Sequence, residues 1–423
     1  MIAARRASPH GASSRRSLRA GLVAIAAVGA ALRVLYVVTA SPELSGQGDW
    51  RFYHFTAGEL AAGRGYRMAR PALGSDAVVT TAAHPPLYPL ALAVAVLGGA
   101  RSETAQRLVG AALGVATIAI AAVLARRVDG PATALVAAAL VALSPSLIAA
   151  DGALLSETLF APLVALVLLC ALALRASPGP GRAFALGVAI GVAALARGEG
   201  VLLLPLVAVP LGTATRRRVA IVLAATLGCA LPLLPWVARN WAVFGRPVLL
   251  STNACGVVAG ANCGATYAGP AIGGWRLECL APPAAANEAD QAALWCQDGI
   301  RYARQHADRV PRVVAARLLR VWNLFPSDFW SVGEGRLARV EHAAAVAQPA
   351  IVIAAIAGTR LLYRRGKPVW ILWSPAVMAS VAAVLGWGLR RLTVAAAAPL
   401  LVLAAVAVVA IASSIRARSR LGR

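Results

Sequence analysis

Apolar stretches recur along almost the whole chain, separated by short polar segments. The first spans residues 18–40 and contains Arg33; ten more follow, at 85–100, 104–125, 131–150, 157–175, 182–197, 199–212, 218–236, 345–362, 368–388 and 391–413. Most approach the roughly 20 residues that an α-helix needs to cross a bilayer. The pattern predicts an all-α, polytopic membrane protein with about 10–11 spans.

Composition agrees with this prediction. Hydrophobic residues make up 59% of the 423 residues, charged residues 14%, and mean hydropathy is +0.71. An average soluble domain carries about 25% charged residues. The balance argues against a soluble globular enzyme.

The chain is strongly basic, with 41 Lys and Arg against 17 Asp and Glu, a net charge of +24. Such a charge can indicate nucleic-acid binding. Here the arginines form short clusters between apolar runs, which is the positive-inside pattern of a membrane protein, so no nucleic-acid partner is expected. The clusters include Arg15/Arg16/Arg19, Arg126/Arg127, Arg216/Arg217/Arg218 and Arg364/Arg365.

The positions of these clusters predict the topology. If the short, proline-led run 85–100 dips in from the outer face without crossing, ten spans leave both chain ends and these basic clusters inside. The first run then acts as a signal-anchor; a cleaved signal peptide is the alternative. The predicted regions are a basic cytoplasmic N-terminus (1–17), a transmembrane core (18–238) with a first outer loop (41–104), an extracytoplasmic loop (239–342), C-terminal transmembrane helices (343–413) and a basic cytoplasmic tail (414–423).

Cysteine usage supports placing the long loop outside. Four of the six cysteines lie in it, namely Cys255, Cys263, Cys279 and Cys296. Four cysteines in one polar segment predict two disulfides in an oxidising compartment, with three possible connectivities. A zinc site is the alternative, but the four show no C-x-x-C spacing.

Candidate chemistry begins in the first outer loop. Asp49 lies among Trp50, Phe52 and Tyr53, next to Arg51. A cation can keep such a carboxylate ionised while sugar rings stack on the aromatics, which favours Asp49 as a general base. The competing interpretation is an interfacial aromatic belt around a solvated aspartate.

Further along this loop, His84 precedes Pro85 and Pro86, which suit the entry of a helix rather than its interior. His84 is therefore expected at a helix N-terminus, where backbone donors favour an anion such as phosphate. A simple chain turn at the interface is the alternative.

Several arginines fall on the outer side, against the positive-inside trend, among them Arg197, Arg239 and Arg391. A lipid phosphate is a suitable partner for guanidinium groups in this position. The alternative is that each arginine side chain snorkels to the lipid headgroups without a specific partner. Nucleotide-binding and zinc-protease signatures are absent from the sequence, so an activated donor at the outer face is expected to be lipid-linked rather than a cytosolic nucleotide.

Segments spread from about residue 20 to 260 carry a family resemblance. They are Asp49 with Tyr53-His54, the segment 57–66, His84-Pro85-Pro86-Leu87-Tyr88-Pro89, Ser156-Glu157-Thr158-Leu159-Phe160, and the segments 195–200 and 235–241. In this order they resemble the GT-C membrane glycosyltransferases related to protein O-mannosyltransferases and the lipid A aminoarabinose transferase.

The resemblance implies a GT-C helical bundle in the plasma membrane that takes a sugar from a polyprenyl-phosphate donor and delivers it to an extracytoplasmic glycan, glycolipid or protein. It implies that Asp49 is the base of an inverting displacement, that Asp151 or Glu157 is the carboxylate of the second outer loop, and that His84 lies near the lipid phosphate. Tyr53, His54, Arg197, Arg239 and Arg391 complete the expected site.

Two features depart from the family. Asp49 is followed by Trp50 where protein mannosyltransferases carry an Asp-Glu pair, and the segment 386–392 matches the basic motif before the last span only loosely. No cofactor is required, although a divalent cation near Asp49 or Asp151 remains open. The alternative functions are a transporter or flippase for a lipid-linked substrate, and a non-catalytic scaffold subunit.

Overall fold

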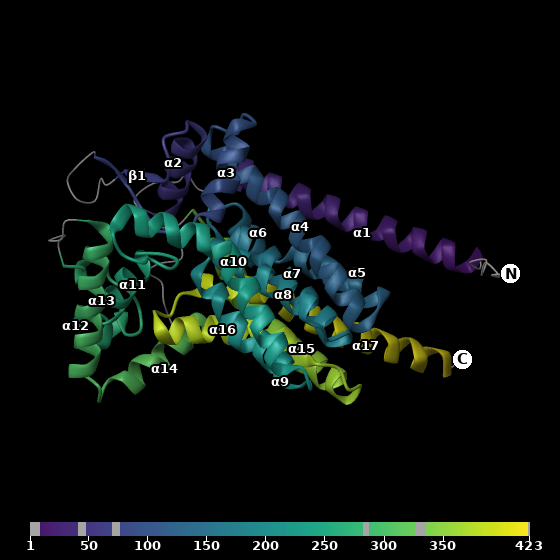
Figure 1. Cartoon of the computed structure of the whole chain (residues 1–423). Coiled ribbons are helices and arrows are strands. Elements are labelled where there is room, and N and C mark those ends of the chain that lie inside the picture. Colours follow the sequence, from purple (N-terminus) through teal and green to yellow (C-terminus); the bar gives the residue numbers. More distant parts are fainter. Residues whose placement is uncertain (1–8, 41–47, 70–76, 282–286, 326–334, 422–423) are drawn as a thin grey trace.

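The structure is a computed structural model that describes residues 9–40, 48–69, 77–281, 287–325 and 335–421. The start of the predicted basic N-terminus (1–8), part of the first outer loop (41–47) and the last two residues of the tail lie outside the described residues. Most of what is described is helical, and the long helices form one bundle (Figure 1).

Within the described residues, six helices are long and apolar enough to cross a membrane, or seven if a bent pair counts as one span. Each corresponds to one of the apolar runs, so the all-α, multi-pass architecture is confirmed. The six are α1 (Pro9–Leu35), α4 (Glu103–Asp129), α7 (Glu157–Ala176), α10 (Arg218–Phe244), α15 (Ala338–Arg364) and α17 (Val394–Leu421).

The other apolar runs are shorter or broken, which differs from ten or eleven plain spans. Run 131–150 forms α5 (Pro131–Leu143) and α6 (Pro145–Asp151), bent by 57°. A proline ring cannot donate a helical hydrogen bond, which explains the break at Pro145. The remaining segments are α3 (Leu87–Leu97), α8 (Pro180–Ala196), α16 (Val369–Leu385) and the run of short turns η3 (Gly198–Leu202), η4 (Leu204–Ala208) and α9 (Val209–Thr213).

Helix α3 has 11 residues and is therefore about 16 Å long, half the thickness of the hydrocarbon layer. This length suits a helix that dips into the membrane without crossing it.

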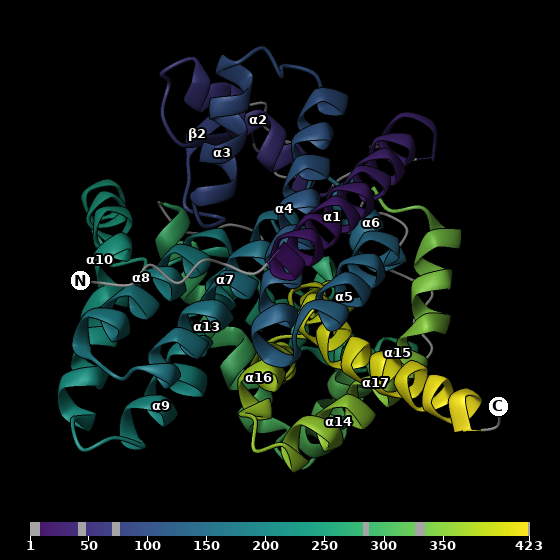
Figure 2. The ribbon, with the colours of Figure 1, turned by 90° about the vertical axis from the view of Figure 1, so that its right-hand side faces the viewer.

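The bundle is organised around α17, which packs against α4, α5, α7, α15 and α16 (Figure 2). Close approach of the peripheral helices depends on small residues, as is common in membranes. A Cβ on Gly187 of α8 would lie 2.0 Å from the carbonyl oxygen of Ala225 in α10, and one on Gly191 would lie 2.4 Å from that of Cys229. The two backbones therefore touch along this seam.

One end of the bundle, hereafter the loop end, carries shorter elements that lie between the long helices in the sequence (Figure 1). They are the turn η1 (Tyr36–Ala40), α2 (Asp49–Ala61), strands β1 (Arg67–Ala69) and β2 (Val78–Thr80), α11 (Asn253–Ala261), α12 (Gly264–Tyr267), η5 (Gly269–Ala271), η6 (Leu277–Cys279), α13 (Glu288–Gln305), α14 (Val310–Val321) and η7 (Arg390–Thr393). The strands pair antiparallel, with Arg67 opposite Thr80.

The predicted loop 239–342 is mostly helical. Its boundaries shift, because α10 continues to Phe244 and α15 already begins at Ala338. The structure pairs Cys255 with Cys296 and Cys263 with Cys279, so the prediction of two disulfides is confirmed and the zinc alternative is not. Arg317 of α14 joins this region to the bundle by donating to the carbonyl oxygens of Ala261 and Val384.

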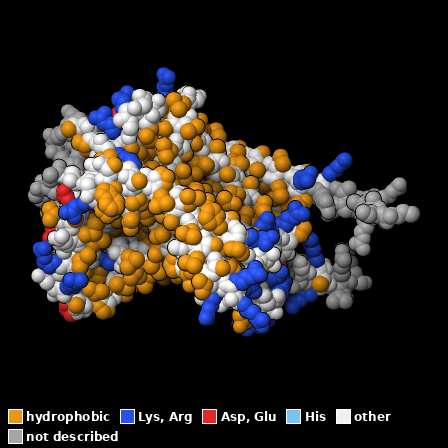
Figure 3. Space-filling view, in the orientation of Figure 1, with side chains coloured by type: hydrophobic (Ala, Val, Ile, Leu, Met, Phe, Trp, Pro, Cys, Tyr) orange, Lys and Arg blue, Asp and Glu red, His pale blue; other side chains and the backbone are white. Residues whose placement is uncertain are grey.

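The opposite end of the bundle, hereafter the basic end, holds the C-terminal part of α17 and the ends of α4, α7 and α15. On the face shown in Figure 3, Lys and Arg side chains lie at both ends and form the densest group at the basic end, whereas Asp and Glu are visible only at the loop end. The charge distribution agrees with the positive-inside pattern along the sequence.

Candidate active site

Asp49 is the first residue of α2 at the loop end. Trp50, Tyr53 and Ala57 form the buried face of this helix and pack with Tyr88 of α3. Their spacing of three and four residues places them on one side, so the helix is anchored and its first turn is held in place. The helix dipole favours an ionised carboxylate at this terminus.

The carboxylate of Asp49 has two basic neighbours. Arg391 of η7 donates from Nη1 to Oδ2 at 3.1 Å, and His84 Nε2 lies 3.6 Å from Oδ1. The side chain is 35% exposed, which leaves one edge of the carboxylate accessible. Partial burial opposes ionisation, but the charges of His84 and Arg391 lower the pKa of Asp49 below its ordinary value. Asp49 is therefore ionised at neutral pH.

Arg391 also connects Asp49 to Glu157, the first residue of α7. Glu157 is buried, and its Oε1 accepts hydrogen bonds from Arg391 Nε and from Arg197 Nη1, the latter at 2.7 Å. Arg197 in turn donates from Nε to Glu199 at 2.6 Å. Glu157 Oε2 is buried and has no hydrogen-bond partner among the described residues. This oxygen retains an unused acceptor site.

Tyr53, Ser156 and His84 line the same region. The Tyr53 hydroxyl donates to Ser156 Oγ at 3.1 Å and lies 3.5 Å from His84 Nδ1, while Tyr66 donates to the carbonyl oxygen of His84 at 2.9 Å. Burial lowers the pKa of His84 more than the nearby Asp49 charge raises it. His84 comes three residues before α3 begins at Leu87, at the helix entry that the prolines predict.

Asp151, expected to be catalytic, lies in a different environment. Its Oδ2 accepts from Arg33 Nε at 2.6 Å and its Oδ1 from Thr158 Oγ1 at 2.8 Å. The two charged side chains are 1% and 4% exposed. Arg33 also donates to the carbonyl oxygens of Gly29 and Ala142. The group is closed, and it makes no ion pair with the Asp49 group in the described structure.

His54 and Arg239 also point elsewhere. His54 Nδ1 lies 3.0 Å from Gln106 Oε1 at the start of α4. Arg239 donates to the carbonyl oxygens of Thr81 and Tyr66, and its guanidinium lies over the rings of Tyr66 and Trp236. Arg239 therefore ties α10 to the β1–β2 hairpin.

A second charged group at the loop end was not predicted. Arg336 is 3% exposed and donates from Nη1 to Glu341 at 3.1 Å, and Glu341 also pairs with Arg390 at 3.3 Å. Within the described residues, Arg336 Nε and Nη2 have no hydrogen-bond partner. The charge of Arg336 acts on both Asp151 and Glu157, so it lies near the site. The signal in the sequence was the same as for Arg391, an arginine on the outer side before a span.

The part of the chain that the structure describes contains no group of three or more His, Cys, Asp or Glu side chains arranged to hold a metal ion. Glu157 shares Arg391 with Asp49, and two guanidinium groups already neutralise its charge. These side chains do not fit a divalent cation, because positive neighbours occupy the positions where further oxygen ligands would be needed.

Residues 83–238 match the family model of dolichyl-phosphate-mannose-protein mannosyltransferases. The match includes His84, Glu157 and Arg197, whereas Asp49 and Arg391 lie outside it. No curated protein sequence matches the chain significantly.

Two solved structures share the fold. The archaeal oligosaccharyltransferase AglB from Archaeoglobus fulgidus, in complex with an inhibitory peptide and a dolichol-phosphate, aligns with a TM-score of 0.58 and 17% identity over 96% of this chain and 52% of its own. Its apo form aligns with a TM-score of 0.58 and 18% identity over the same shares. The chain thus spans about half the length of AglB.

ArnT from Cupriavidus metallidurans, bound to undecaprenyl phosphate, aligns more weakly, with a TM-score of 0.44 and 18% identity over 91% of this chain and 77% of its own. The predicted resemblance to the GT-C membrane glycosyltransferases is confirmed by the family match over residues 83–238 and by the AglB-like fold of almost the whole chain.

Proposed function

We propose that this protein transfers a sugar from a polyprenyl-phosphate carrier to an acceptor on the extracytoplasmic side of the membrane. The family that residues 83–238 match is described by a dolichyl-phosphate-linked donor, and AglB was solved with a dolichol-phosphate and a peptide. Two disulfides at the loop end support an oxidising compartment for this side. The acceptor is a glycan, a glycolipid or a protein.

The observation that carries the proposal is the contrast between two carboxylates joined by one arginine. Asp49 has a 35% exposed side chain, while the Glu157 side chain is 1% exposed and shares one oxygen between two guanidinium groups. A base must reach the acceptor and must be ionised. Asp49 meets both conditions, whereas Glu157 is enclosed.

In the proposed step, Asp49 accepts the proton of an acceptor hydroxyl as the acceptor oxygen forms a bond to the anomeric carbon. The bond between that carbon and the phosphate oxygen breaks, and polyprenyl phosphate leaves with the electron pair. A single in-line displacement of this kind inverts the anomeric centre. The charge of Arg391 helps to keep the base ionised.

The leaving phosphate needs a guanidinium group that still has free donors. Arg197, Arg391 and Arg336 all pair with carboxylates, but in the described part of the chain the buried Nε and Nη2 of Arg336 have no hydrogen-bond partner. A guanidinium group with free N–H donors is a good ligand for a phosphate group. We assign Arg336 as the principal phosphate ligand and His84 as a hydrogen-bonding neighbour. No step is derived through a metal ion.

The test is transfer of radiolabelled sugar from synthetic polyprenyl-phosphate sugars in membranes that contain either the wild type or Asp49→Asn. General-base catalysis contributes about 10²–10⁴-fold, so we expect the variant to lose at least 100-fold in rate at unchanged detergent-soluble yield. Asp129→Asn, far from the site at the basic end, is the matched control. Equal activity in all three proteins would exclude Asp49 as the base.

The same assay separates a transferase from a flippase. A flippase moves the lipid-linked sugar across the bilayer without breaking its bond to phosphate, so the label stays in the lipid fraction. Movement of intact donor with no wild-type-dependent release of polyprenyl phosphate would replace the transferase by that alternative.

A further inference from the structure

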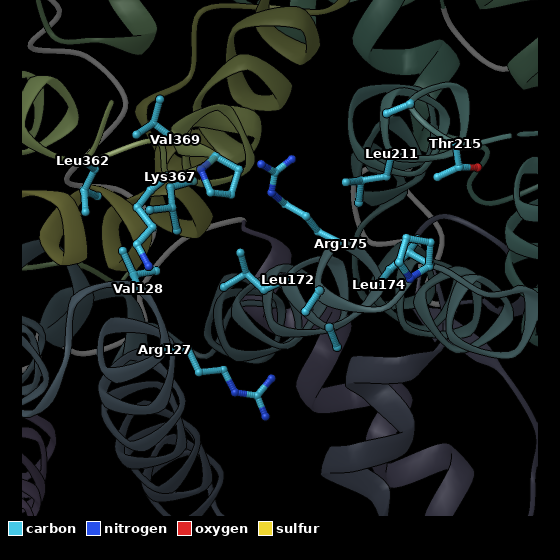
Figure 4. Close-up of a pocket in the computed structure, with 17 residues that line it drawn as sticks. Arg127, Val128, Leu172, Leu174, Arg175, Leu211, Thr215, Leu362, Lys367 and Val369 are labelled. Carbon is cyan, nitrogen blue, oxygen red and sulfur yellow. The ribbon is translucent and has the colours of Figure 1, made fainter. Parts of the chain in front are cut away.

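A cavity opens at the basic end of the bundle, away from the candidate active site. It has a volume of about 790 Å³ and is bounded by the ends of α4 and α7, the segment after α9, and the turn between α15 and α16. Figure 4 shows Arg127, Arg175 and Lys367 around it, with Leu172 and Leu211 among the apolar side chains that complete the wall. A cavity of this size accommodates a small organic group.

The three cations at this cavity come from three different elements, at the end of α4, the end of α7 and the turn before α16. In the described part of the chain, none of them forms an ion pair. The one described carboxylate at this end, Asp129, is already engaged by Arg365 and by Thr133. The cavity therefore presents three positive charges that no side chain neutralises.

The position of the cavity along the bundle indicates which membrane surface it lies near. Glu157 begins α7 at the loop end and Arg175 lies 18 residues later on the same helix, a rise of about 27 Å. This is close to the 30 Å thickness of the hydrocarbon layer, so the cavity lies near the opposite membrane surface. The concentration of arginine there marks the cytoplasmic side.

We propose that this cavity binds the headgroup of an anionic phospholipid from the cytoplasmic leaflet. Its phosphate oxygens accept hydrogen bonds from Arg127, Arg175 and Lys367, and its acyl chains follow apolar side chains such as Leu172 and Val369. Basic pockets between membrane helices on the cytoplasmic side are typical sites for anionic lipid headgroups. The cavity is lined by both basic and apolar side chains. This favours a lipid over free phosphate, because a phosphate ion has no apolar part that could contact the leucine and valine side chains.

Such a lipid would join α4, α7 and the α15–α16 turn at the end of the bundle that has no disulfide. A ligand that binds only the folded state stabilises it by mass action. The site is independent of the proposed transferase reaction, since its residues contact none of the active-site side chains.

The test uses the full chain in neutral phosphatidylcholine nanodiscs with added cardiolipin, read by native mass spectrometry and by thermal unfolding. The wild type should retain cardiolipin and unfold at a higher temperature. Each basic residue near an anionic surface contributes about fivefold in affinity, so the triple variant R127Q/R175Q/K367Q should bind roughly 100-fold more weakly.

The matched control is R126Q/R217Q/R364Q, which removes the same charge from the same end at exposed residues outside the cavity wall. An equal loss in this control would show a general surface-charge effect and overturn the proposal. Thr215→Trp keeps the cations but fills the cavity, and it should also lose the lipid.

Ligand identity is tested in separate arms. Stabilisation by inorganic phosphate to the same extent as by cardiolipin would replace the lipid with a free anion. Stabilisation by polyprenyl phosphate but not by cardiolipin would replace it with the carrier lipid. Either result overturns the phospholipid assignment.

Discussion

Two groups of carboxylate and arginine side chains meet at the start of helix α7, and their environments differ. In the Asp49 group, Arg391 is shared between a partly exposed aspartate and the buried Glu157, and Glu157 keeps one oxygen unused. In the Asp151 group, both oxygens accept from Arg33 and Thr158, and the charged side chains are at most 4% exposed.

Position in the sequence alone does not distinguish these carboxylates, whereas their environments in the fold do. Asp151 and Glu157 are six residues apart and both carry charge into an apolar bundle. Asp151 is saturated by its neighbours and therefore holds α1 to the centre of the bundle. In the Asp49 group, by contrast, the Asp49 carboxylate is partly exposed and can be reached by an acceptor. A reacting group requires this accessibility.

The largest expected effect is on catalysis at Asp49. Asp49→Asn should lower kcat/KM by about 10²–10⁴-fold, equivalent to about 3–5 kcal/mol of transition-state stabilisation. The thermal unfolding temperature in detergent should change little, because the side chain is partly solvated. A variant that loses activity only in proportion to its folded fraction would place Asp49 in the structural class with Asp151.

Asp151→Ala should have the opposite profile. It leaves Arg33 charged and buried without its partner, which costs about 3–5 kcal/mol of unfolding free energy. Thermal unfolding of the purified protein measures the loss, and activity per folded molecule should stay near wild type. The control is Asp129→Ala, whose ion pair with a half-exposed Arg365 should contribute less than about 1 kcal/mol.

A single methyl group should disturb the closed group. A Cβ added to Gly114 of α4 would lie 2.1 Å from Asp151 Oδ2 and 2.3 Å from Arg33 Nε, so Gly114→Ala forces the ion pair apart. Overpacking of this kind costs about 1–3 kcal/mol. Gly58→Ala on α2, where a Cβ meets nothing within 4 Å, should not destabilise. Equal stability of both variants would contradict the tight packing around Asp151.

The pH profile of kcat/KM should test whether Arg391 lowers the pKa of Asp49. Arg391 is one of the charges that lower the pKa of Asp49, so its removal in Arg391→Gln leaves burial less opposed and raises that pKa. Since the base acts only when ionised, the acid limb of the profile should move to higher pH. Arg391→Lys keeps the charge and should largely preserve the limb. If the acid limb of the glutamine variant does not move, Arg391 does not control the pKa of the base.

The smallest expected effect on transfer activity comes from replacing the closed pair altogether. Arg33→Met combined with Asp151→Leu removes both buried charges, and such replacements are often neutral or stabilising by up to about 4 kcal/mol. Transfer activity should persist. Loss of activity in a stable double variant would show that Asp151 takes part in the reaction after all.

The sequence by itself determined the class of protein and the two ends of the bundle. Apolar runs of about 20 residues, arginine clusters and a cysteine-bearing loop follow from solvation and redox chemistry, which act on local composition. The same local signals identified Asp49, His84, Glu157, Arg197 and Arg391 as unusual, because charges beside apolar segments are costly and therefore conspicuous.

Only the tertiary structure decided which of these residues meet. Asp49 and Arg391 are 342 residues apart, and the contact of Arg391 with Asp49 and Glu157 depends on how the turn before α17 packs against α2 and α7. The closed pairing of Asp151 with Arg33 depends on a glycine in a third helix. The unpaired donors of Arg336 and the cations of the basic cavity could not be recognised from sequence, because whether a charge is satisfied depends on neighbours that the fold brings from distant parts of the chain.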